Sequence, residues 1–298
     1  MAGLVERRDV LIESDEVTLA GSIWLPTMPP RTGVVMHPGS GPSDRDNDGY
    51  FATLRNSLVN SGHAVSSYDK RGVGGSSGRW EDAPIETQGR DLIAAADRLA
   101  DFPEMKDVPI GLFGHSQGGW VALDAASRRP YTSFLIVNSG PGVAPWVQER
   151  YAARMALENS GADNAATEKG LAHYDLVTRL ARARTPWEQV KDRTEELAPY
   201  LPGDPWAWHF WMTILDFDPA RALSSIHIPI LTLWGERDRL VPVEESISVY
   251  RVRVPPTRLV VEVFPDADHR VQVGDPPRLA PGYTEAVLGF IDSHLEGG

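Results

Sequence analysis

The chain contains no cysteine among its 298 residues. This absence excludes disulfides, thiolate nucleophiles and cysteine-ligated metal sites, and it fits a reducing compartment. Long apolar runs are also missing, since none reaches the roughly 18 residues that a membrane-spanning helix needs. The first nine residues lack the apolar core of a secretory signal. We therefore expect a cytoplasmic protein without a membrane partner.

Basic residues are in deficit, with 29 Lys and Arg against 41 Asp and Glu and a formal net charge of −12. Nucleic acids and anionic membranes both bind clustered Lys and Arg side chains, so neither is an expected partner. The length suits one domain that carries an insertion better than two equal domains. The sequence does not indicate an oligomeric state.

Short apolar runs alternate with helical patterns along most of the chain. The expected strands cover residues 10–13, 17–25, 33–36, 64–68, 110–113, 134–137, 228–234 and 259–264. Helical patterns follow most of them, and repeated strand–helix units are typical of a parallel sheet that is covered on both faces. The sequence therefore predicts an α/β fold with a mostly parallel sheet.

The alternation stops between about residues 143 and 222, which carry helical patterns and no convincing strand. We predict a core domain at residues 1–142 and 223–298 and a helical cap, or lid, at residues 143–222. The aromatic run at 206–211 has two interpretations: it packs the cap onto the core, or it lines an apolar substrate pocket. The candidate pocket residues are Trp206, Trp208, His209 and Trp211, with His37 at a strand end.

The pattern Gly-x-Ser-x-Gly occurs twice, at residues 114–118 and 74–78. The first copy lies between an apolar strand and a helical pattern, which is the context of a nucleophile elbow with Ser116 at its tip. Such a turn holds its serine in strained backbone and needs glycines on both sides. The second copy lies in a Gly- and Ser-rich run, so Ser76 is predicted to be a loop residue.

A serine hydroxyl needs a base and a carboxylate that orients the base. When the elbow serine comes first in the chain, the acid follows a later strand and the histidine follows the last one. His269 fits the base and Asp238 fits the acid, with Glu236 as the alternative. Asp266 and Asp268 are too close in sequence to brace the ring. Because a base must be neutral, activity should fall below about pH 6.5, the ordinary imidazole value.

The glycine-rich loop at residues 37–46 is expected to supply part of an oxyanion hole. The proposed donors are the backbone N–H groups of Ser40 and Gln117. Residues 44–49 match the first half of a calcium loop, but Arg55 stands where that loop requires a glutamate. No metal and no cofactor are therefore predicted.

Taken together, these residues resemble the α/β-hydrolase superfamily over residues 10–295, in particular its capped serine esterase and peptidase-like branch. The resemblance rests on Gly-Ser-Gly-Pro at 39–42 with Asp-Arg-Asp at 44–46, Tyr-Asp-Lys-Arg-Gly at 68–72 and Gly-His-Ser-Gln-Gly at 114–118. It implies an eight-stranded sheet, a helical cap, the triad Ser116, Asp238 and His269, and the oxyanion donors Ser40 and Gln117. Pro38 departs from the pattern, because many relatives carry a histidine directly before the glycine.

The expected function is hydrolysis of a small or medium apolar carboxylic ester, without a cofactor, through an acyl-enzyme. A thioesterase or acyltransferase would share this intermediate, and an amidase or peptidase could use the same triad. A ligand-binding receptor that retains the triad but turns over slowly is an alternative of another class, because fold does not determine function.

Overall fold

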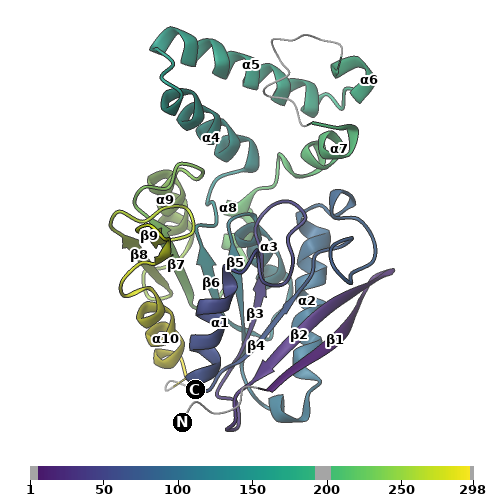
Figure 1. Cartoon of the computed structure of the whole chain (residues 1–298), viewed down its shortest axis with the longest axis vertical. Coiled ribbons are helices and arrows are strands. Elements are labelled where there is room, and N and C mark those ends of the chain that lie inside the picture. Colours follow the sequence, from purple (N-terminus) through teal and green to yellow (C-terminus); the bar gives the residue numbers. More distant parts are fainter. Residues whose placement is uncertain (1–5, 192–202, 296–298) are drawn as a thin grey trace.

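The computed structural model describes residues 6–191 and 203–295. Eight strands form one sheet in the order β1-β2-β4-β3-β5-β6-β7-β8 (Figure 1). β1 and β2 are antiparallel to each other, β2 is antiparallel to β4, and all other neighbours are parallel. The predicted mostly parallel eight-stranded sheet is confirmed.

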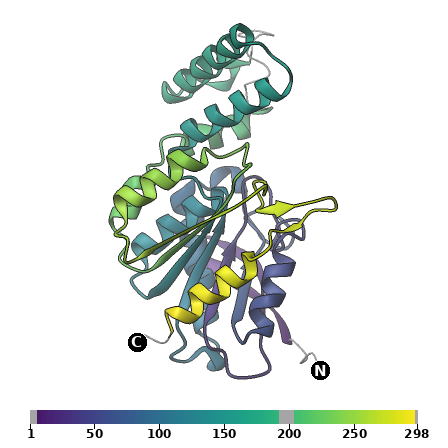
Figure 2. The ribbon, with the colours of Figure 1, turned by 90° about the vertical axis from the view of Figure 1, so that its left-hand side faces the viewer.

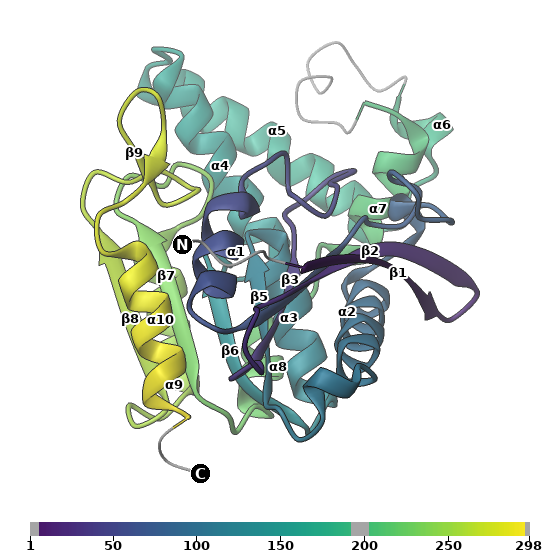
Figure 3. The same ribbon diagram turned by 60° about the horizontal axis from the view of Figure 1, so that its bottom comes forward.

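In chain order, the strands are β1 (Glu6–Ser14), β2 (Val17–Leu25), β3 (Gly33–His37), β4 (Ala64–Tyr68), β5 (Ile110–His115), β6 (Thr132–Asn138), β7 (Ile230–Gly235) and β8 (Leu259–Phe264). A separate two-stranded sheet joins β9 (Gln272–Val273) to β10 (Arg278–Leu279). Figure 3 shows the β1–β2 hairpin at one edge of the main sheet and β8 at the other.

The central strands are apolar at almost every position because both of their faces are covered. In β6, Phe134 and Ile136 belong to one hydrophobic core, whereas Leu135 and Val137 belong to the core on the opposite face. This alternation follows from the two-residue repeat of a strand. It explains why the sequence shows continuous apolar runs at these strands rather than alternation with polar residues.

Helices cover both faces of the sheet, as Figure 2 shows with α9 and α10 on opposite sides. One face carries α2 (Ile85–Ala100), α3 (Gln117–Arg128) and α9 (Val243–Arg253). The other face carries α1 (Phe51–Asn60) and α10 (Tyr283–Ser293). The two cores therefore lie on either side of one sheet.

Between β6 and β7 the chain forms α4 (Pro145–Asn159), α5 (Asn164–Arg182), α6 (Trp187–Val190), α7 (Pro205–Ile214) and α8 (Pro219–Ser224). No strand occurs in the described parts of this segment, residues 143–191 and 203–222. Figure 1 shows α4 to α7 above the end of the sheet at which β6 finishes. These helices have a small hydrophobic core of their own, which contains Val177, Leu180 and Trp208.

Candidate active site

Ser116 lies at the turn between β5 and α3. Its backbone has φ 55° and ψ −123°, a conformation that costs a non-glycine residue about 1–3 kcal/mol. The turn is tight, because a Cβ added at Gly114 would lie 2.0 Å from the Gly118 carbonyl oxygen, and one at Gly118 would lie 2.6 Å from the His37 carbonyl oxygen. The Ser116 N–H donates to the Asn138 carbonyl at 2.9 Å. The predicted strand–turn–helix geometry is present.

Gly114→Ala should destabilise the fold at this turn. The added methyl group would overlap a backbone oxygen, which cannot rotate away as a side chain can, so we expect the free energy of unfolding to fall by about 2–3 kcal/mol. Urea unfolding followed by circular dichroism measures this change. Gly289→Ala is the matched control, because a Cβ there meets nothing within 4 Å. Equal unfolding midpoints for the two variants would contradict the close approach at Gly114.

His269 and Asp238 form a hydrogen-bonded pair. His269 lies in the loop after β8 and Asp238 in the loop after β7. The His269 Nδ1 atom is 2.8 Å from Asp238 Oδ2, and the Asp238 side chain is fully buried. The other carboxylate oxygen accepts from the N–H groups of Leu240 at 2.8 Å and Val241 at 3.0 Å. The carboxylate is therefore fixed and in turn fixes the imidazole ring.

The other carboxylates near His269 are engaged elsewhere. Glu236 Oε2 accepts from the Asp266 N–H at 3.1 Å, and Glu236 is exposed. Asp268 Oδ1 accepts from backbone N–H groups within its own loop, including that of Arg270 at 2.9 Å. Of the four acids considered from the sequence, Asp238 is the one whose side chain is hydrogen-bonded to His269.

The loop of His269 packs against the elbow through His115, the residue before Ser116. The two histidine rings have centroids 5.2 Å apart, and His115 Nδ1 is hydrogen-bonded to the Asn138 side-chain amide at 2.9 Å. Burial, with a further contribution from His269, lowers the pKa of His115 well below its ordinary value. Among the described residues, no hydrogen bond joins the Ser116 hydroxyl to His269. Catalytic hydrogen bonds of this kind are often long before substrate binds.

The loop after β3 also lies against the elbow. A Cβ added at Gly39 would be 3.6 Å from the Ser116 Cβ, so the peptide that joins Gly39 to Ser40 is next to the serine. Gln117 is the first residue of α3, where backbone N–H groups have no partner within the helix. The two predicted oxyanion donors, Ser40 and Gln117, therefore come from segments that meet at Ser116.

His37 is buried, and both of its ring nitrogens are hydrogen-bonded to other side chains. Its Nδ1 atom is 2.8 Å from the Tyr68 hydroxyl, and its Nε2 atom is 3.3 Å from Gln88 Oε1. Burial lowers the pKa of His37 to about 3, so the ring is neutral. With both ring nitrogens engaged, His37 packs the interior beneath the site, and this arrangement does not support a substrate contact.

The candidate pocket residues of α7 do not share one face. Trp208 is 1% exposed and lies in the core of the helical segment, where its indole N–H donates to the Thr185 carbonyl at 2.9 Å. Trp206 is 47% exposed, and His209 is exposed. Trp211 is partly buried and packs against both the helical core and the main core. Packing is thus the interpretation that fits Trp208 and Trp211.

Two contacts that the sequence did not predict join α7 to the short helix η1 (Trp80–Asp82) and the residue before it. Phe210 packs edge-on against Trp80, with ring centroids 5.1 Å apart. The Arg79 guanidinium lies 3.6 Å from the centre of the Trp206 ring. These contacts depend on a loop 130 residues earlier in the chain, so local periodicity could not reveal them.

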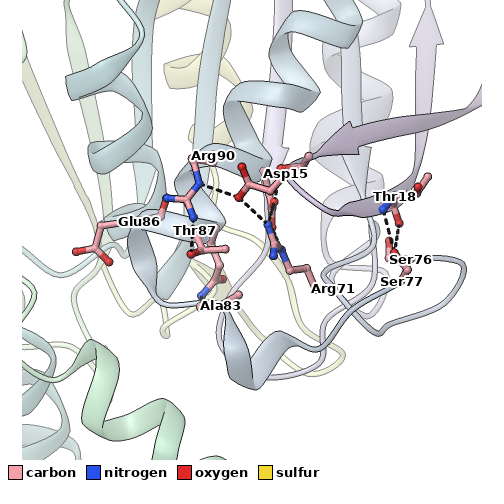
Figure 4. Close-up of polar contacts among 12 residues, drawn as sticks. Asp15, Thr18, Arg71, Ser76, Ser77, Ala83, Glu86, Thr87 and Arg90 are labelled. Carbon is pink, nitrogen blue, oxygen red and sulfur yellow. Dashed lines mark hydrogen bonds and ion pairs between the residues drawn. The ribbon is translucent and has the colours of Figure 1, made fainter.

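Lys70 was also not predicted as a site residue, although it stands in the motif at 68–72. It lies two residues after the end of β4, and a lysine so close to the end of a buried strand is the signal that could have identified it. Its loop is held by neighbours: Arg71 pairs with Asp91 at 2.7 Å and reaches Asp15 at 3.5 Å, and Arg90 also binds Asp15 (Figure 4). The second serine motif lies in the same loop.

Comparison with known proteins identifies the family. The family described as serine aminopeptidase, S33 (Hydrolase_4) matches residues 45–276, a span that contains Ser116, Asp238 and His269. The chain belongs to this family. It is therefore a hydrolase of the α/β-hydrolase fold, as the sequence motifs predicted.

Curated relatives include palmitoyl-protein thioesterase ABHD10, a mitochondrial protein. The human sequence is 39% identical over 69 residues, which are 23% of this chain and 21% of ABHD10. The mouse sequence is 22% identical over 214 residues, which are 71% of this chain and 60% of that protein. The chain thus spans less than two thirds of these relatives.

Solved structures share the fold over nearly the whole chain. The Pyrococcus furiosus esterase Pf2001 has a TM-score of 0.67 and 21% identity, and covers 97% of this chain and 91% of its own. DcsB, solved in complex with its substrate analogue, has a TM-score of 0.70 and 14% identity, and covers 98% of this chain and 100% of its own. At these identities the likeness concerns the fold alone.

Within residues 6–191 and 203–295, no helix combines the length and the apolar character that crossing a membrane requires. The same part of the chain contains no group of three or more His, Asp or Glu side chains that could hold a metal ion.

Proposed function

We propose that this protein is a serine esterase that cleaves a small or medium apolar carboxylic ester through an acyl-enzyme. In this mechanism Ser116 attacks the carbonyl carbon while His269 takes the serine proton and passes it to the leaving alcohol. Asp238 holds the imidazole in the tautomer that can accept that proton. Water then releases the acid by the same proton transfers in reverse. The 2.8 Å bond between His269 and Asp238, in a loop packed against a strained serine elbow, carries this proposal.

The oxyanion of the tetrahedral intermediate would accept from the backbone N–H groups of Ser40 and Gln117. Each such donor is worth about 2.7–4 kcal/mol of transition-state stabilisation. The closeness of Gly39 to Ser116, whose Cβ would lie 3.6 Å from a Cβ added at Gly39, supports this assignment. The scheme uses no cofactor and no metal ion.

We also propose that residues 1–142 and 223–298 form the catalytic domain and that residues 143–222 form a cap over it. Two hydrogen bonds from α4 support this division, because they end on the loop of the proposed acid. The Tyr151 hydroxyl donates to the Asp238 carbonyl at 3.0 Å, and the Gln148 amide donates to the Leu240 carbonyl at 2.7 Å. Movement of the cap would therefore shift the loop that carries Asp238.

A thioesterase is the second candidate, because ABHD10 is described as a palmitoyl-protein thioesterase. The two chemistries share the acyl-enzyme and differ only in the leaving group. The net charge of −12 favours a small-molecule substrate over a nucleic acid or an anionic membrane. The lack of cysteine supports a cytoplasmic location, while the mitochondrial ABHD10 relatives make an organelle the alternative.

A panel of p-nitrophenyl esters of increasing acyl length, beside matched acyl-CoA thioesters and amino-acid p-nitroanilides, tests the proposal. We expect kcat/KM for the esters to rise by up to about fourfold per methylene until the acyl pocket is full, because a buried CH₂ is worth about 0.8 kcal/mol. Faster turnover of thioesters would favour the thioesterase, and faster turnover of anilides the peptidase. Stoichiometric phosphonate labelling with almost no turnover would favour a receptor.

A further inference from the structure

Lys70 is a buried cation that joins the two segments of the proposed oxyanion hole. The residue is 3% exposed. Its ammonium group donates to the Gly39 carbonyl oxygen at 2.9 Å and to Gln117 Oε1 at 3.1 Å. One acceptor precedes Ser40 in the loop after β3, and the other belongs to the first residue of α3. Lys70 is therefore bound to both segments at once.

The bond to Gly39 acts on the same peptide unit that carries the proposed Ser40 donor. The carbonyl of one residue and the N–H of the next share a planar, trans peptide group, so they point in opposite directions. Holding the carbonyl oxygen of Gly39 on Lys70 therefore fixes the direction of the Ser40 N–H. A cation on the carbonyl also polarises the peptide and strengthens its N–H as a donor.

The charge of Lys70 is not cancelled by a contact ion pair within the described part of the chain. Asp69, the preceding residue, binds Arg45 at 2.7 Å, and Asp91, whose charge acts on Lys70, binds Arg71 at 2.7 Å. Both partners of the lysine are neutral oxygens. A buried cation behind two donors raises the positive potential where negative charge develops on the substrate.

We propose that Lys70 is a positioning residue of the oxyanion hole, which orients the Ser40 N–H donor, holds its loop against the first residue of α3 and adds positive potential behind the Ser40 and Gln117 donors. This inference rests on the proposed function, since it assumes that an oxyanion forms at this place. It concerns a residue that does not touch the reacting atoms and acts through the backbone groups that do.

The charge state of Lys70 is sensitive to pH in the working range. Burial lowers its pKa to about 7, and Asp91 on α2 opposes this decrease. His37 on β3 also faces it and is neutral, with a pKa of about 3. The next residue, Arg71, is held by Asp91, and Gln117 on α3 is uncharged. Raising the pH through 7 therefore removes the charge, and the potential behind the donors decreases.

Lys70→Met is the primary test, with esterase activity measured on the full-length protein. We expect kcat to fall about 10- to 100-fold with KM changed less than threefold, less than the loss of a whole oxyanion donor, which costs about 10²- to 10³-fold. The melting temperature should stay close to that of the wild type, because replacing a buried charge by an apolar chain of similar volume is often neutral. Lys106→Met, at an exposed position, is the control for removal of one lysine charge and should leave kcat unchanged.

The pH profile separates positioning from a merely structural role. For the wild type, kcat/KM should decrease above about pH 7 as Lys70 loses its proton, and this alkaline decrease should be absent in Lys70→Met. Wild-type kcat in Lys70→Met, or the same alkaline limb in both proteins, would overturn the inference. If Lys70→Met folds poorly, a wild-type profile without an alkaline limb between pH 7 and 9 would overturn it as well.

The Ser116→Ala variant keeps this outcome separate from that of the proposed function. If Ser116→Ala retains activity, the proposed function fails and with it the site that Lys70 would serve. If Ser116→Ala is inactive while Lys70→Met matches the wild type in kcat and pH profile, the inference about Lys70 fails alone.

Discussion

Ser116→Ala is expected to lower kcat by about 10⁶-fold, as removal of the nucleophile does in other serine hydrolases. The substitution deletes one oxygen and leaves the turn intact, because the backbone bonds of Ser116 to Asn138 and Gly119 do not involve the side chain. We expect the melting temperature to be unchanged within about 2 °C. A substitution that removes no packing contact and no buried hydrogen bond changes the free energy of unfolding by at most about 0.5 kcal/mol. Active-site titration with a fluorophosphonate, followed by mass spectrometry, should show one adduct on the wild type and none on the variant.

Ser76→Ala is the matched control, because Ser76 stands in the second copy of the same motif. Its hydroxyl donates to the Asp69 carbonyl at 2.7 Å and accepts from the Ala20 N–H at 2.9 Å, which are the contacts of a structural loop serine. The variant should therefore lose about 1–2 kcal/mol of stability and retain kcat. Retained activity in Ser116→Ala, or loss of labelling in Ser76→Ala, would show that the wrong serine had been chosen.

The two serine motifs illustrate what the sequence could predict. The motif letters do not distinguish Ser116 from Ser76, whereas the apolar strand before Ser116 and the helical pattern after it do. The structure confirms that context: β5 and α3 flank Ser116, and Ser76 lies in a loop. Element type was predictable because the strands of a doubly covered sheet are almost wholly apolar, which makes them distinct from the helices between them.

The pairing of Asp238 with His269 was predictable from chain order, because parallel strands bring the loops at their carboxyl ends to one edge of the sheet. β7 and β8 are neighbours in that sheet. The loops that follow them, which carry the two residues, therefore begin side by side. Glu236 stands in the same loop after β7, so this placement does not separate it from Asp238. The 2.8 Å bond from Asp238 to His269 supports Asp238.

The roles of the tryptophans in α7 and of Lys70 were not predictable in the same way. Positions 206 and 208 are two apart, so a helix places them about 200° from each other. However, α7 is apolar on most sides, and its sequence does not show which side faces the small core around Val177 and Leu180. Lys70 is buried and binds Gly39 and Gln117, which lie 31 and 47 residues away in the chain. Such contacts join segments dozens of residues apart, and no local pattern encodes them.

Asp238→Asn is expected to lower kcat by about 10⁴-fold with little change in KM. The structure determines which way the amide would lie. Because Oδ1 accepts from the N–H groups of Leu240 and Val241, the amide oxygen must take that position and the NH₂ group must face His269 Nδ1. Two donors cannot bond, so the imidazole would have to accept at Nδ1 and carry its proton on Nε2. The nitrogen that must take the serine proton would then already be protonated.

Glu236→Gln is the control, because it makes the same carboxylate-to-amide change two residues away at an exposed position that does not bond to His269. It should retain kcat within about twofold, as exposed substitutions of this kind rarely matter. The tautomer itself can be read from the ¹⁵N chemical shifts of the His269 imidazole. In Asp238→Asn alone, the shift of a protonated nitrogen should move from Nδ1 to Nε2. A large loss in Glu236→Gln with normal activity in Asp238→Asn would transfer the role of the acid to Glu236. The hydrogen bond from the Asp266 N–H would then have to break for Glu236 to reach the ring.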